Sequence, residues 1–330
     1  MLNIKRKSLL IGIILLIVCY IFSGCNSATE SELDVPKSDL EDVEKPMFTA
    51  DGIRALSVVK QGKEIFSISY NPKEYKSDFD YWEISVPYNG LTCTNTEVMY
   101  KLFGIIAGMD FTNTVTLDKE TVTGIADTNT TLSLEFIQSV GAEERGIADA
   151  DNKATILIGN KDSNGNYYVA IQGYENQVYV VKQNIIDSVL SINPFDYILK
   201  ISSLINNESI TDIEITIGKE NHVLAKNGNI YSFDKKEVEK KEFVTLFQDI
   251  QFVIIDSELE SEIEQTDERK AILSIVYNRN TEEAPKITTS YYVLDETYCS
   301  VNINGMERFK VMKEDVQKLI KQILEWGQTP

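Results

Sequence analysis

The sequence predicts an α+β protein with two tandem, duplicated β-rich units, each with an antiparallel sheet and one or two packed helices. Three observations predict this fold class. Short segments rich in Val, Ile, Thr and Tyr alternate between apolar and polar residues, as half-buried strands do. Helical periodicity occurs in the middle and at the end of each unit. The same order of elements occurs twice, at a spacing that indicates tandem domains and not a solenoid of short repeats.

The chain begins with the regions of a bacterial export signal. Lys5, Arg6 and Lys7 form a basic start, and an uncharged apolar run of 14 residues, 9–22, follows it. A membrane-spanning helix needs about 18 or more such residues. Residues 1–24 are therefore predicted to be a signal peptide.

The residues that follow the apolar run resemble a bacterial lipobox, although Phe22 stands where leucine is usual. Ser23 and Gly24 are small enough to enter a narrow peptidase cleft, and the Cys25 thiol supplies the nucleophile for a diacylglyceryl group. We expect cleavage between Gly24 and Cys25, lipidation of Cys25, and attachment to the extracytoplasmic face of the cell membrane. The alternative is an uncleaved transmembrane anchor in which Cys25 has no role.

Residues 25–48 are predicted to be the lipidated cysteine and an acidic tether. The stretch 26–45 has seven acidic and two basic residues and no aromatic residue, so it can bury too little apolar surface to fold. Loss of the three basic residues of the signal peptide changes the formal net charge from -19 to -22. Such a protein lacks the basic footprint that nucleic acid requires, and anionic lipid would repel it without an anchor.

The first repeat is predicted to span residues 49–205. Its first two strands lie in 53–71 around a turn at 61–63, and a third strand covers 80–87. Thr94 and Glu97 match a capping box, which predicts a helix over 94–109. Further strands are expected at 114–118, 130–137, 153–160 and 166–173, then a strand and a short helix in 177–190, and a connecting helix in 192–210.

The second repeat is predicted to span residues 206–330. We expect strands in 210–233 around a turn at Asn227 and Gly228, a helix over 240–250, strands at 270–278, 286–295 and 298–305, and a strand running into a helix in 308–326. A shift of 130 pairs Tyr168 with Tyr298, Tyr179 with Phe309, Val181 with Val311, Ile186 with Val316, Val189 with Leu319 and Leu190 with Ile320. A shift of 144 pairs Leu102-Phe103 with Leu246-Phe247. The shared order favours duplication over chance alignment of alternating apolar positions.

One family shows the same order of elements. Trp82, Ile84 and Pro87 form a W-x-I-x-x-P motif, and a helix and the strands ILIGN, YYV and VYVV follow it. From about residue 50 to the C-terminus, the chain resembles the bacterial domain of unknown function 4340, although Thr123-Gly124-Ile125 replaces the usual tyrosine-glycine-leucine. The resemblance implies an envelope protein, similar to parts of the auxiliary components of gliding-type ABC transporters, and it supplies no catalytic residues.

The sequence shows little that is typical of catalysis or of cofactor binding. His222 is the single histidine; it lacks the partners of a catalytic triad or a zinc site, and we expect a surface residue beside a turn. The segments 149–153 and 162–166 only partly resemble calcium loops and are expected to be solvated turns. Without a phosphate-binding loop, we expect no nucleotide, and we expect no cofactor or metal.

Two further residue types leave alternatives open. Cys93 and Cys299 remain in the mature chain, and they form either one disulfide or two buried free thiols. The tyrosines of the two repeats are expected to fill half-buried sheet faces more than to form a glycan or partner surface; they are Tyr167, Tyr168, Tyr174 and Tyr179, and Tyr291, Tyr292 and Tyr298.

The leading functional hypothesis is a non-enzymatic, lipid-anchored envelope protein that assists a membrane complex such as an ABC exporter. Its expected partners are the membrane, through the diacylglyceryl anchor, and an integral membrane transporter subunit. The second hypothesis is a lipoprotein that binds a small molecule or glycan between the repeats. An enzyme is the third.

Overall fold

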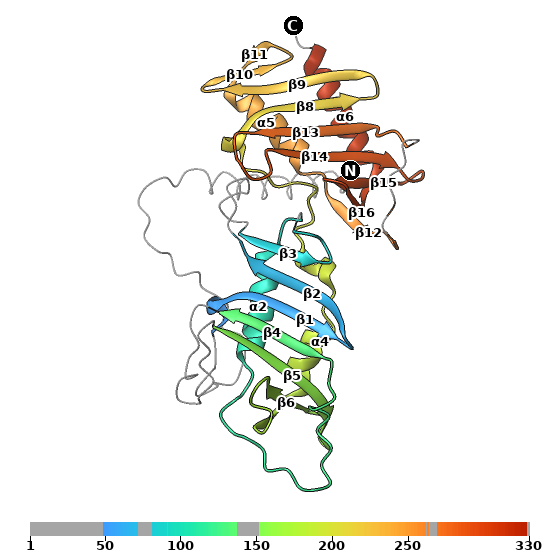
Figure 1. Cartoon of the computed structure of the whole chain (residues 1–330). Helices are drawn as coiled ribbons and strands as arrows, with labels where there is room; N and C mark the ends of the chain where they lie inside the picture. The colour runs from blue at the N-terminus through green and yellow to red at the C-terminus, as the bar shows by residue number, and fades with distance from the viewer. Residues whose placement is uncertain are drawn as a thin grey trace, which may run out of the picture. The chain divides into compact units, whose positions relative to one another are not determined.

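The computed structural model describes residues 49–71, 81–90, 92–136, 152–261, 263 and 269–328. Within them it has two antiparallel sheets and four α-helices, so the predicted α+β class is confirmed (Figure 1). The predicted signal peptide and tether, residues 1–48, lie outside the described residues. Below, the first half means residues 49–205 and the second half means residues 206–328.

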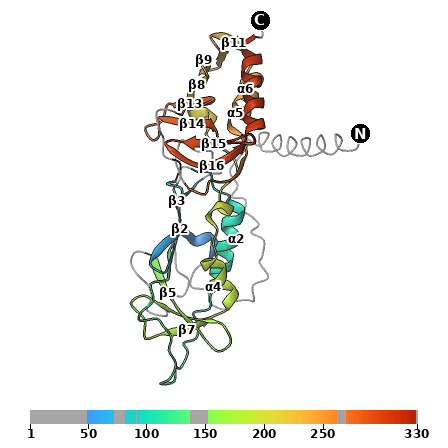
Figure 2. The same ribbon diagram turned by 90° about the vertical axis from the view of Figure 1, so that its right-hand side faces the viewer.

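The first half contains a seven-stranded sheet with the order β3-β2-β1-β4-β5-β6-β7. Its strands are β1 Ile53–Lys60, β2 Lys63–Tyr70, β3 Trp82–Val86, β4 Thr131–Phe136, β5 Lys153–Lys161, β6 Tyr167–Ile171 and β7 Val178–Val181. A short 3-10 helix, η1 Ala50–Gly52, precedes β1. Helices α2 (Thr96–Ala107) and α4 (Gln183–Leu190) lie on one face of this sheet (Figure 2). Alternate strand residues such as Leu56 and Val58 are buried against them.

The second half contains a nine-stranded sheet with the order β11-β10-β9-β8-β13-β14-β15-β16-β12. Its strands are β8 Ile210–Ile217, β9 Glu220–Asn227, β10 Ile230–Phe233, β11 Lys236–Val238, β12 Ile255–Glu258, β13 Leu273–Arg279, β14 Lys286–Val293, β15 Tyr298–Ile303 and β16 Met306–Met312. Helices α5 (Lys240–Gln251) and α6 (Lys313–Gln328) cover one face of this sheet (Figure 2).

The two sheets share an order of strands and helices. Without β11 and β12, the second order reads β10-β9-β8-β13-β14-β15-β16, which matches β3-β2-β1-β4-β5-β6-β7 position by position. Helices α2 and α5 each have 12 residues, and both their first and their last residues lie 144 positions apart. Helices α4 and α6 begin 130 positions apart. These offsets equal the shifts read from the sequence.

One of the predicted residue pairs does not occupy equivalent positions. Tyr168 lies opposite Val180 on β7, and at a shift of 130 its equivalent must lie opposite Lys310. The residue opposite Lys310 is Ser300, whereas Tyr298 lies opposite Met312. The sequence alignment of these strands was therefore wrong by two residues, because alternating residues align equally well after a shift of two.

The predicted capping box of the first helix is also wrong. Asn95 caps α2, and its side chain accepts a hydrogen bond from the Val98 backbone at 3.3 Å. The Thr94 hydroxyl instead donates to the carbonyl of Trp82 on β3 at 3.1 Å. Helix α5, by contrast, has a complete capping box between Glu239 and Glu242.

Two other predicted elements are absent from the described chain. Residues 114–118 form no strand. The Val115 N–H donates to the Val178 carbonyl at 2.7 Å, but a single backbone hydrogen bond does not make a β-ladder. Residues 192–210 contain only short 3-10 helices, η2 Pro194–Tyr197 and η3 Asn207–Ser209, in place of the expected connecting helix. Both segments carry apolar residues at the spacing of a strand or a helix, but their backbone groups form hydrogen bonds with other segments.

Residues 199–205, at the end of the first half, form backbone hydrogen bonds with both halves. The Leu199 N–H donates to the Cys93 carbonyl at 2.7 Å. Farther along, the Ser202 N–H donates to the Val253 carbonyl at 2.9 Å, and the Ile255 N–H donates to the Lys200 carbonyl at 3.1 Å. These bonds keep residues 199–202 extended and explain why no α-helix forms there.

Buried polar groups fix the end of this segment in the second half. The Tyr291 hydroxyl donates to the Ser202 hydroxyl at 2.9 Å, and the Ser203 and Tyr277 hydroxyls are 3.1 Å apart. The Gln251 side-chain amide donates to the Ile205 carbonyl at 3.1 Å. Burial raises the pKa of both tyrosine hydroxyls. The residues just before the predicted boundary at 206 therefore belong to the core of the second half.

Candidate functional site

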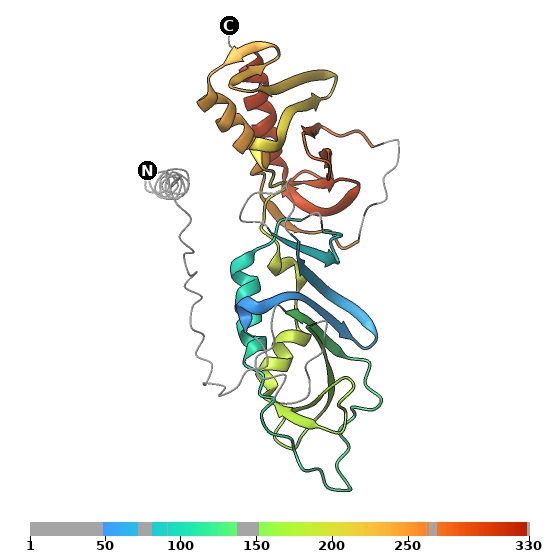
Figure 3. The same ribbon diagram turned by 60° about the vertical axis from the view of Figure 1, so that its left-hand side comes forward.

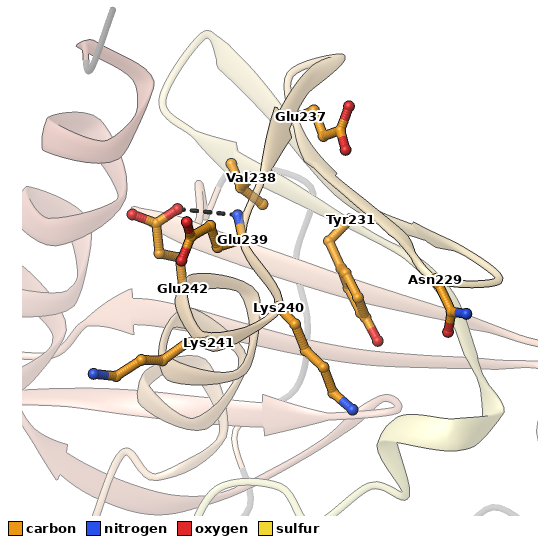
Figure 4. Close-up of a pocket in the computed structure, with 8 residues that line it drawn as sticks. All are labelled: Asn229, Tyr231, Glu237, Val238, Glu239, Lys240, Lys241 and Glu242. Carbon is orange, nitrogen blue, oxygen red and sulfur yellow. Dashed lines mark hydrogen bonds between the residues drawn. The ribbon is translucent and has the colours of Figure 1, made fainter.

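A cavity of about 760 Å³ lies where the hairpin of β10 and β11 meets the first turn of α5 (Figure 4). The pocket falls within the second half, not between the repeats, where the sequence placed a ligand. Tyr231 and Val238 supply apolar lining, and Tyr231 also packs on Phe243 with ring centroids 4.9 Å apart. The remaining lining residues are polar or charged: Asn229, Glu237, Glu239, Lys240, Lys241 and Glu242.

Two of the three carboxylates at this pocket already cap the helix. The Glu239 N–H donates to the Glu242 carboxylate at 3.1 Å, drawn as a dashed line in Figure 4, and the Glu239 side chain accepts from the N–H of Glu242. Lys240 and Lys241 bring positive charge to the same rim. The mixed charge gives the rim no preference for one class of ion, and the capping carboxylates contribute to helix stability.

His222 lies on β9 and is only 12% exposed, so the expected surface histidine is instead largely buried. Its Nδ1 lies 2.7 Å from a carboxylate oxygen of Asp234, and its ring stacks on Phe233 with centroids 5.5 Å apart. The other Asp234 oxygen accepts from the Val223 N–H at 2.8 Å. The pair therefore ties the turn between β10 and β11 to β9. Asp234 was not predicted as the partner of His222, because the short strand β11 was not predicted.

The turn at residues 162–166 behaves as a structural turn. A single oxygen of the Asp162 carboxylate accepts the N–H groups of Asn164 and Asn166, both at 2.8 Å. Gly165 has a φ of 87°, which glycine adopts without strain. The first three residues of the other calcium-like segment, Asp149–Asp151, lie outside the described residues. Across the described part of the chain, no group of three or more His, Cys, Asp or Glu side chains is placed to hold a metal.

The cysteines and tyrosines lie mainly within the fold. Cys93 and Cys299 are both buried and are not joined in a disulfide, which favours the alternative of two buried thiols. Burial raises the pKa of the Cys299 thiol. Tyr179 and Tyr291 are buried, and the other tyrosines of the two clusters are half-buried.

Charged and aromatic side chains of both halves meet around Tyr88. The Tyr88 hydroxyl donates to a Glu258 carboxylate oxygen at 3.0 Å, and its ring centroid lies 5.3 Å from that of Phe309. Arg308 donates to the same carboxylate oxygen at 3.3 Å and to the Pro87 carbonyl at 3.1 Å. Burial and the neighbouring Glu258 charge raise the pKa of Tyr88. Because these groups bind one another, the cluster has a structural role: it joins the residues after β3 to strands β12 and β16.

The predicted lipidation and cleavage residues, Gly24 and Cys25, lie outside the described residues. Within the part of the chain that the structure describes, each helix is too short or too polar to cross a membrane. Searches of family models, curated proteins and solved structures find no match to this chain.

Proposed function

We propose that this protein is a non-enzymatic lipoprotein, anchored to the extracytoplasmic face of the cell membrane, that assists a membrane complex such as an ABC exporter. The observation that carries the proposal is the stretch Ser23-Gly24-Cys25, which follows a basic start and a short apolar run. Two acyl chains on Cys25 give stable attachment, whereas one chain gives only marginal binding. The resemblance to the domain of unknown function 4340 supports an envelope location.

The acidic tether supports a role beside a membrane partner. A flexible chain of about 20 residues has an r.m.s. reach of roughly 25 Å, and more where its charges repel. The folded halves are then held near the membrane at high effective concentration, so a weak interface with an integral membrane protein is sufficient.

The proposal includes duplication of one ancestral unit. It is supported by the shared order of seven strands and by helix offsets of 144 and 130 that equal the shifts read from the sequence. The equivalent buried pairs Ile186 and Val316, and Val189 and Leu319, support it further. Duplication predicts that each half keeps a core of its own.

Metabolic labelling with a fatty-acid analogue tests the anchor. Cys25→Ala should abolish labelling and leave the precursor uncut. Cys19→Ala is the matched control, because that residue lies in the segment expected to be removed, and its labelling should be unchanged. Equal labelling of the Cys25→Ala variant and wild type would refute the lipid anchor and favour an uncleaved transmembrane segment.

Crosslinking in intact cells tests the partner. Lipidated protein should capture an integral membrane protein, and protein without Cys25 should capture much less. A second candidate, binding of a polar small molecule or glycan, is supported by the 760 Å³ pocket, a volume within the usual range of ligand sites. Full complementation of a deletion strain by the soluble form, with no membrane crosslink, would favour this second candidate.

A further inference from the structure

The connection between α2 and β4, residues 108–130, is an unusually long loop. It contains no helix or strand, and it extends past the last strands of the first sheet (Figures 1 and 3). Loops longer than about 12–15 residues without secondary structure are uncommon in compact domains and are usually functional or disordered. The contacts at the base of this loop show which of the two applies.

The base of the loop is fixed to the sheet. The Asn160 N–H on β5 donates to the Thr123 carbonyl at 2.7 Å, and the Asn160 side chain donates to the Val122 carbonyl at 3.1 Å. A Cβ on the neighbouring Gly159 would lie 2.2 Å from the Thr123 carbonyl oxygen, so glycine permits this close approach. Ile125 is buried beside Val178. The loop therefore has a defined base.

The tip of the loop is also held in one shape. The Asp118 carboxylate accepts from the Glu120 N–H at 3.1 Å and from the Thr121 hydroxyl at 2.5 Å. The Thr121 hydroxyl lowers the pKa of this carboxyl, because it donates a hydrogen bond to the charged form. Leu117 and Val122 stand directly before and after this turn.

The two residues beside the turn are apolar and exposed. Val122 is 74% exposed, the most of any large hydrophobic residue among the described residues, and Leu117 is 37% exposed. Binding usually costs free energy because a loop must be ordered. This loop is already ordered by its hydrogen bonds, and the burial of Leu117 and Val122 by a partner would be favourable.

The second half uses the equivalent connection differently. After α5 the chain forms β12, which pairs with β16 and becomes the edge of the sheet. After α2 the chain only touches the edge of β7, through Val115 and Val178, before it turns outward. The start of the connection thus pairs with the sheet in the second half, whereas in the first half the connection forms no strand.

We propose that the tip of this loop, Leu117–Val122, docks into an apolar pocket with a basic rim on the extracytoplasmic part of an integral membrane protein. Charge selects this occupant: residues 110–130 contain Asp110, Asp118, Glu120 and Asp127 against Lys119 alone. Anionic lipid and a second copy of this acidic chain would both repel the tip, whereas a basic rim attracts it. The inference rests on the proposed function, because it names the surface that the membrane partner contacts.

The test uses full-length lipidated protein in intact cells of the source bacterium. A photo-crosslinking amino acid at position 117 should capture one integral membrane protein, identified by mass spectrometry. Val122→Asp should lower that yield at least about tenfold, because it places a carboxylate in an apolar pocket. The matched control is Ile230→Asp, at a 59% exposed isoleucine of the second half that lies opposite Asn227, which should leave the yield unchanged. Both variants should keep the wild-type melting temperature, because both side chains are exposed.

Other outcomes separate the two proposals. If probes elsewhere capture a membrane protein but position 117 does not, or if Val122→Asp leaves the yield at position 117 unchanged, the loop assignment is overturned and the proposed function stands. Capture of lipid or of a second copy at position 117 also overturns the loop assignment. If no position captures a membrane protein, the proposed function fails and the loop assignment fails with it.

Discussion

Replacement of Ser203 by Ala tests whether residues 199–205 belong to the core of the second half. The Ser203 and Tyr277 hydroxyls are 3.1 Å apart, and Tyr277 is fully buried. Ser203→Ala leaves the tyrosine hydroxyl without this partner, which costs about 1–3 kcal/mol of unfolding free energy. Tyr277→Phe removes that hydroxyl, so we expect the double variant to be more stable than Ser203→Ala by about 1 kcal/mol.

Urea unfolding of the soluble chain that begins at residue 26 measures this coupling. The two tryptophans fall one in each half, so Trp326 fluorescence in a Trp82→Phe background follows the second half alone. Unchanged m-values would show that the variants alter stability and not the extent of unfolding. Ser257→Ala, which removes a hydroxyl whose bond to Asp256 is exposed, is the control and should change stability by less than about 0.5 kcal/mol.

A coupling energy near zero would refute the reasoning, because the two hydroxyls would then act independently. It would also place the boundary of the second half after Ser203, where the sequence put it. A coupling of about 1 kcal/mol would move the boundary toward residue 199.

Three other predictions follow from the same contacts. A fragment of residues 199–328 should melt cooperatively, whereas 206–328 should be less stable by a few kcal/mol because it lacks the partners of several buried polar groups; equal stability would contradict the core assignment. Burial lowers the pKa of Lys200 to about 8, against about 10.4 when unfolded, so unfolding free energy should rise from pH 8 toward pH 10, and Lys200→Met should lack this rise in a urea titration. Cys93 and Cys299 should react with a thiol reagent only in denaturant; fast reaction of the native protein would contradict their burial.

The sequence predicted the sheets because their signals are local. Gln61 and Gly62, with φ of 52° and 77°, close the first hairpin at the expected turn. Helices α4 and α6 begin 130 residues apart, as the apolar pattern indicated. In such elements the alternation or the 3.6-residue period, the turn residues and the burial all agree, so one sequence is sufficient.

The failures occur where a distant partner decides the structure. Residues 114–118 alternate like a strand, but only Val115 finds a backbone acceptor, on β7. The expected connecting helix is replaced by an extended segment, because its backbone groups bond to residues near 93 and 254. The pocket was missed for a similar reason: it depends on β11, a strand of three residues that is too short to show a period.

The same comparison bears on the proposed docking of the loop tip of the first half, because the two halves cover their last strands differently. An exposed sheet edge invites uncontrolled pairing, so each half must protect its last strand. The second half covers β16 with a short strand, β12, at the start of the equivalent connection. The first half protects β7 with a single backbone bond from Val115 and fixes the loop again at Asn160, so the residues between these points are free to face a partner. A duplicated unit can diverge in this connection without loss of its sheet, because Leu117 and Val122 are exposed and contribute little to the core.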